Sequence, residues 1–259
     1  MSRTTSRRRP AARPRHRRTA VLVASVTGVA VLTYGCLPEP QKGAATAGAR
    51  ETPAWSEEQP EPDEPSTPAG PSIPATGSGE FATARDTLGP VGKGTLRRYR
   101  VQIEDSLDLS LPETAREVNA ILGDPRGWTA EGDAFQLVPS GPVDFTVKIA
   151  TPSTVDAICG AAGLETQGKV NCTVGSTVVV NLRRWQLRSP QFDGPIEEYR
   201  ALIINHEVGH RLGHGHEGCP GPGKLAPAMM QQIKGLKGCK ANAWPYDRQG
   251  KYIKGPPVD

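Results

Sequence analysis

Four of the chain's five histidines lie within eleven residues, from His206 to His216. On a helix, His206 and His210 stand one turn apart on the same face, so both imidazoles can reach a single metal ion. Glu207 lies beside the first histidine, where it could take a proton from a zinc-bound water without binding the metal. Gly213 can adopt the left-handed conformation that ends a helix, which lets the chain turn back and bring in His216. The spacing predicts a three-histidine zinc site with its own general base.

The alternative interpretation is a helix end with exposed histidines that bind nothing. A bare HExxH pattern occurs by chance in about one chain in a hundred of this size, estimated from average residue usage. Requiring Gly213 and His216 as well makes a chance match rarer by about three orders of magnitude. His214 falls between two of the expected ligands, and we expect it to point away from the ion, into solvent or behind a ligand.

The pattern HExxHxxGxxH, followed by a methionine-containing turn, resembles the signature of the metzincin zinc peptidases. The resemblance implies that His206, His210 and His216 bind zinc and that Glu207 is the general base. It also implies a methionine beneath the metal, as a hydrophobic floor and not as a ligand. Both Met229 and Met230 are candidates, and the small Ala228 two residues before Met230 slightly favours Met230.

The resemblance covers about residues 84–259 and implies an α+β fold. In this fold a twisted mixed sheet and an active-site helix are followed by a small irregular C-terminal half. Two features depart from the clan: the methionines follow His216 after only thirteen or fourteen residues, and Gln231 and Gln232 stand where the astacin branch has a tyrosine ligand. Tyr246 is the nearest downstream tyrosine. The segments HEVGHRLGHGHEGC and MMQQ resemble those of a group of exported, membrane-anchored bacterial proteins without an assigned substrate.

Hydrophobic periodicity predicts the order of elements that would position this site. The expected elements are a strand near 98–104, a helix near 113–122, strands near 135–138 and 145–149, and a hairpin of 169–173 with 177–183. The zinc-binding helix should start at Pro195, with two glutamates in its first turn. Its face of Ile196, Tyr199, Leu202 and Ile203 should pack on the sheet.

The N-terminus indicates export. Residues 1–18 contain eight arginines and no acidic residue, and residues 19–37 form an uncharged, largely apolar run. A run of this length can span a bilayer, with the basic flank in the cytoplasm and residues 38–259 outside. We favour a single-pass signal anchor in the cell membrane. A secreted protein with a cleaved signal, or a lipid anchor at Cys36, remains an alternative.

Residues 38–83 differ sharply in composition from the rest of the chain. They hold nine prolines and eight acidic residues against two basic ones. Such a segment cannot bury enough apolar surface to fold by itself, so we expect a disordered tether. The alternative is an inhibitory pro-segment in which an acidic residue such as Asp63 blocks the zinc.

Four cysteines follow the tether, and an even number in an exported domain predicts two disulfides. Three pairings are possible, and we favour the local one, Cys159 with Cys172 and Cys219 with Cys239. A cysteine-rich zinc site is the rival interpretation, but no CxxC spacing supports it.

Residues 84–259 contain 21 basic and 19 acidic residues, and this balance gives no reason to expect a nucleic-acid partner. We expect a monomeric zinc metalloendopeptidase that binds a peptide or protein substrate along an edge strand near 169–173. Two other functions stay open. One is a catalytically silent, zinc-stabilised binding module at the cell surface, and the other is a zinc amide hydrolase that acts on cell-wall peptides.

Overall fold

The computed structural model describes residues 72–258. The expected basic segment 1–18, the expected span 19–37 and most of the expected tether 38–83 lie outside these residues. Among the helices of residues 72–258, none is both long enough and apolar enough to cross a membrane.

A mixed seven-stranded sheet forms the centre of the described fold. Its order is β2-β4-β3-β5-β7-β6, and β1 pairs with the end of β3. Strands β3, β4, β5 and β7 are parallel to their neighbours in this group, whereas β1, β2 and β6 pair antiparallel. The strands are β1 (Phe81–Thr83), β2 (Leu88–Gly92), β3 (Thr95–Glu104), β4 (Asp133–Leu137), β5 (Phe145–Ala150), β6 (Cys172–Val174) and β7 (Thr177–Asn181).

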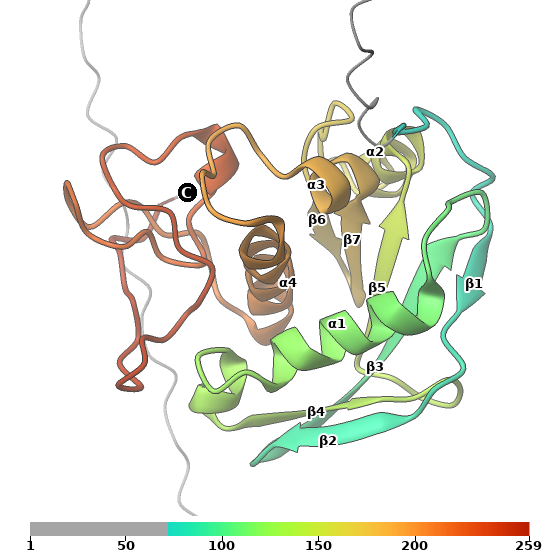
Figure 1. Cartoon of the computed structure of the whole chain (residues 1–259), viewed down its shortest axis with the longest axis horizontal. Helices are drawn as coiled ribbons and strands as arrows, with labels where there is room; N and C mark the ends of the chain where they lie inside the picture. The colour runs from blue at the N-terminus through green and yellow to red at the C-terminus, as the bar shows by residue number, and fades with distance from the viewer. Residues whose placement is uncertain (1–71, 259) are drawn as a thin grey trace, which may run out of the picture. The chain divides into compact units, whose positions relative to one another are not determined.

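Four α-helices and two short 3-10 helices accompany the sheet in the described part of the chain. They are α1 (Leu111–Gly123), 3-10 helix η1 (Trp128–Glu131), α2 (Pro152–Gly160), α3 (Leu182–Leu187), α4 (Ile196–Leu212) and η2 (Gln232–Lys234). Figure 1 shows α1 lying across the sheet and α4 seen nearly end-on, with the C-terminal segments beyond α4. The mixed sheet with several helices confirms the α+β class.

Side-chain alternation along β7 explains why both faces of the sheet are covered. Val178 and Val180 belong to the main core, together with buried side chains of α1 and α4. Val179 points to the opposite face, where it packs with Val155 and Cys159 of α2. Because successive side chains of a strand point to opposite faces, three consecutive buried valines require a layer of helices on each side.

Helix α4 has the local signals expected for it. Its side chains Tyr199, Leu202 and Ile203 are buried, as the apolar spacing predicted. Gly213 ends the helix with a φ of 98°, and its backbone N–H donates to the carbonyl oxygens of Gly209 and His210. Pro195 is the N-cap residue and not the first helical residue, so the helix starts one position later than expected.

The structure differs from the expected elements in three places. The sheet begins before residue 84, because Phe81–Thr83 of the expected tether pairs with the end of β3. The strand expected over 177–183 ends at Asn181, whose side chain caps α3 by accepting a hydrogen bond from the Arg183 N–H. Strand β2 and helix α2 were not expected, since glycine and proline interrupt the first and the second is only nine residues long.

A buried carboxylate joins β3 to the start of α2 and to the segment that precedes β1. Glu104 is fully buried and accepts hydrogen bonds from the Gly79 N–H (2.7 Å), the Thr151 N–H (2.7 Å) and the Thr154 hydroxyl (2.6 Å). Burial by itself would raise the pKa of Glu104, but these hydrogen bonds outweigh it and hold the pKa below its ordinary value. This network fixes the end of the central strand on which β1 is paired.

The C-terminal part after α4 is largely irregular, as expected. Its backbone is held by isolated bridges, such as Leu225 with Lys240, and by the disulfide between Cys219 and Cys239. The second disulfide joins Cys159 of α2 to Cys172 of β6. Both pairs are the local ones favoured from the sequence.

Candidate metal centre

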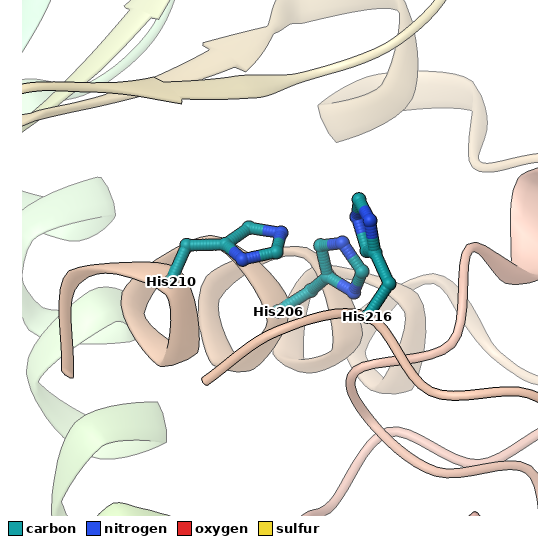
Figure 2. Close-up of side chains that lie close together, drawn as sticks. All are labelled: His206, His210 and His216. Atoms are coloured by element: carbon teal, nitrogen blue, oxygen red, sulfur yellow. The ribbon is translucent and has the colours of Figure 1, made fainter. Parts of the chain in front are cut away.

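Three histidines come together at the C-terminal end of α4 and in the segment that follows it. The candidate ligand atoms of His206, His210 and His216 all lie within 4.8 Å of one another. Figure 2 shows the three imidazoles facing a common space, two from the helix and one from the segment that follows it. The predicted triad is therefore assembled in the fold.

Backbone carbonyl groups set the orientation of the two helix histidines. The Nδ1 atom of His206 lies 2.8 Å from the Ala228 carbonyl oxygen, and that of His210 lies 2.9 Å from the His214 carbonyl oxygen. A carbonyl oxygen can only accept, so each Nδ1 carries the proton and each Nε2 keeps a free lone pair. The helix histidines thus present the nitrogen that a metal ion requires.

Contacts with two other segments position His216. Its carbonyl oxygen accepts a hydrogen bond from the Val258 N–H (3.0 Å). The next residue, Glu217, donates its N–H to the Met229 carbonyl oxygen (3.1 Å), and its carboxylate accepts from the Tyr252 hydroxyl (3.1 Å). The position of His216 therefore depends on the segment around Met229 and on the C-terminal segment.

The three histidines could hold a metal ion. Burial, and next the charge of His210, lower the pKa of His206 to about 3, and burial also lowers the pKa of His210 and of His216. Neutral imidazole is the form that binds metals. Within residues 72–258, no carboxylate or thiolate joins the triad. Three histidines without a fourth protein ligand are typical of catalytic zinc sites.

Glu207 is buried, with 5% of its surface exposed. Burial raises the pKa of its carboxyl group to about 7, while a hydrogen bond from the Thr173 hydroxyl acts in the opposite direction. That hydroxyl lies 2.8 Å from Glu207 Oε2. A carboxyl group with a pKa near neutrality can both accept and release a proton, as a general base must.

The methionines occupy different places. A turn closed by a hydrogen bond from the Met230 N–H to the Pro227 carbonyl oxygen (3.0 Å) carries Met229 at its third position. Met229 is fully buried in the main core and packs against Gly209 of α4. Met230 belongs to a smaller cluster with Ala226 and Cys239, and it lines the cleft described next.

A cleft of about 910 Å³ contains the three histidines and Glu207. One wall comes from residues 164–175, the other from residues 230–234, and α4 supplies the floor. Cys172 and Thr173 of β6 line the first wall, and β6 is the last strand in the sheet order. Within the described sheet its outer edge has no partner strand, so an extended chain in the cleft could pair with it.

Other residues considered from the sequence lie elsewhere. His214 points away from the triad, as expected: its ring stacks on Trp128, and its Nε2 lies 2.9 Å from Glu131 Oε2. Tyr246 does not line the cleft and packs near Tyr252. Thr173 has no spacing pattern that marks it in the sequence, because its contact with Glu207 joins residues 34 positions apart.

No curated protein and no solved structure matches this chain. A family model described as "Protein of unknown function (DUF3152)" matches residues 67–247, which include all three histidines of the triad and Glu207. Since this match covers more than half of the chain, the protein belongs to the DUF3152 family.

Proposed function

We propose that this protein is an extracytoplasmic, metzincin-like zinc metallopeptidase, anchored in the membrane through residues 19–37. One observation carries the proposal: the buried carboxylate of Glu207 lies beside three imidazoles that converge in an open cleft. A purely structural zinc site takes four protein ligands and has no need of a base. The arrangement therefore supports catalysis better than it supports a silent binding module.

Each residue of the site has a chemical role in this proposal. Bound zinc would lower the pKa of a water to about 7 and polarise a substrate carbonyl group. Glu207 takes a proton as the water attacks the peptide carbonyl carbon, and then passes that proton to the leaving amine. The carbonyl oxygens of Ala228 and His214 keep His206 and His210 in the tautomer that binds metal.

The cleft supports a peptide as the substrate. An extended chain that pairs with the free edge of β6 would cross the floor formed by α4, where the triad and Glu207 lie. Backbone pairing is independent of side chains, so it suits an enzyme that cleaves peptide bonds in many sequences.

The proposal is tested by comparing the full-length wild type with a Glu207→Gln variant and a His216→Ala variant. Zinc content and cleavage of a mixed peptide library are measured for all three. We expect equal zinc in wild type and Glu207→Gln, with the cleavage rate of Glu207→Gln lower by about 10²- to 10⁴-fold. His216→Ala should lose both zinc and activity.

The outcomes separate the remaining functions. Zinc in the wild type without peptide cleavage would contradict the peptidase proposal, and a parallel assay with cell-wall peptides would then identify an amide hydrolase. Inactivity on both substrates would favour a binding module. A wild type that binds no zinc would overturn the proposal at its first step.

A further inference from the structure

We propose that Thr173 is a positioning residue that holds the Glu207 carboxylate for proton transfer. The inference rests on the proposed function, since it gives Thr173 a role in the reaction that Glu207 would catalyse. It adds a residue outside the HExxHxxGxxH segment, in the wall of the cleft that contains β6.

The contact is direct. Thr173 Oγ1 lies 2.8 Å from Glu207 Oε2 and 2.9 Å from the Glu207 carbonyl oxygen. A threonine hydroxyl has one proton to donate, and an ionised acceptor makes the stronger hydrogen bond, so the carboxylate is the preferred partner. Within residues 72–258, no other group donates a hydrogen bond to this carboxylate. Thr173 is therefore the described residue whose hydrogen bond fixes the direction of the Glu207 carboxylate.

The geometry leaves the second carboxylate oxygen available. Thr173 binds Oε2, and Oε1 has no hydrogen-bond partner among the described residues. A carboxylate held at one oxygen can present the other to a water molecule in a fixed direction. Proton transfer depends steeply on such positioning, because the reacting atoms must be in line before the bond forms.

Strand pairing and a neighbouring disulfide fix the backbone of Thr173. Its backbone pairs with Val178 of β7. The preceding residue, Cys172, is bonded to Cys159 of α2 by a disulfide. A β-branched side chain also has few rotamers, so a fixed backbone gives a fixed hydroxyl. The short edge strand β6 can therefore carry a positioning group despite having only one neighbouring strand.

Thr173→Val tests the hydroxyl while it preserves the shape and β-branching of the side chain. With a peptide cleaved by the wild type, we expect kcat to fall about 10- to 100-fold while KM stays within about twofold. Thr173→Ser keeps a hydroxyl and should recover most of kcat. Zinc content should equal that of the wild type in both variants. A residue needed only for strand packing would tolerate valine and would show no rescue by serine.

A double-mutant cycle tests the contact without using activity. Thermal unfolding is measured for wild type, Thr173→Val, Glu207→Ala and the double variant, at matched zinc content. We expect Thr173→Val to lower the Tm by about 3 °C or more in the wild type, and by clearly less when Glu207 is alanine. When residue 207 is alanine, the Thr173 hydroxyl can still donate to its backbone carbonyl oxygen. The coupling therefore reports how much more the carboxylate contact stabilises the protein than this alternative contact.

The kinetic assay and the thermal-unfolding cycle distinguish failure of the role of Thr173 from failure of the proposed function. Additive Tm shifts, or a wild-type kcat in Thr173→Val, would overturn the role of Thr173 even in an active peptidase. An inactive wild type whose Tm shifts are coupled would instead remove the proposed function while it upholds the Thr173–Glu207 contact.

Discussion

Gly209, inside the HExxH segment, offers the sharpest test of how α4 is packed. A Cβ atom at this position would lie 2.4 Å from Met229 Sδ and 2.7 Å from Trp128 Cζ2. Both distances are too short for non-bonded atoms. We expect Gly209→Ala to destabilise the protein, although alanine is the better helix former.

The magnitude follows from two opposing effects. Alanine in place of glycine favours a helix by about 1 kcal/mol. Overpacking a well-filled core costs about 1–3 kcal/mol. The Met229 side chain can rotate, but Trp128 is fully buried and its indole N–H donates to the Asn205 carbonyl oxygen (2.9 Å). Because one neighbour cannot yield, we expect a net loss of about 1–2 kcal/mol in the free energy of unfolding.

Thermal unfolding of the wild type and the variant measures this loss. For a domain of this size, the expected decrease in Tm is about 2–8 °C. Gly160→Ala is the matched control, since Gly160 is also helical but exposed, and a Cβ there would meet nothing within 4 Å. A Tm of Gly209→Ala equal to or above that of the wild type would refute the reasoning.

Three further predictions concern stability. Glu104→Gln should lower the free energy of unfolding by about 2 kcal/mol at neutral pH, because an amide cannot accept all the hydrogen bonds that the carboxylate accepts. The folded-state pKa of Glu104 lies below its ordinary value of 4.5, so its stabilisation is complete above that pH and is lost as pH falls through the folded-state pKa. Urea titrations at several pH values should therefore show the difference narrowing in acid, and a constant difference would contradict the assignment. Replacing Cys219 and Cys239 by serine should cost about 3 kcal/mol, which urea unfolding would measure, and an unchanged midpoint would speak against the bridge as a stabilising crosslink. Removing zinc with a chelator should lower the Tm of the wild type by about 5–10 °C if zinc is bound at 100 times its Kd, whereas a chelator should leave the Tm of His216→Ala unchanged.

The local features of this protein could be predicted from its sequence. His206, Glu207, His210 and Gly213 lie within two turns of one helix, whose geometry depends on neighbouring residues alone. The same holds for helix α1, which ends before Asp124-Pro125, and for the short β6–β7 hairpin. In each case the interacting groups are close in sequence, so the spacing of residue types is sufficient to predict the element.

Features that depend on distant residues came only from the tertiary structure. Strand β1 has little pattern of its own and exists because the end of β3 offers a free edge. The turn from Pro227 to Met230 places Met229 and not Met230 against Gly209. Thr173 contacts Glu207 directly, because the fold brings β6 against α4. Such contacts leave no regular spacing of residue types in a single sequence. They form when separate elements pack together and exclude water.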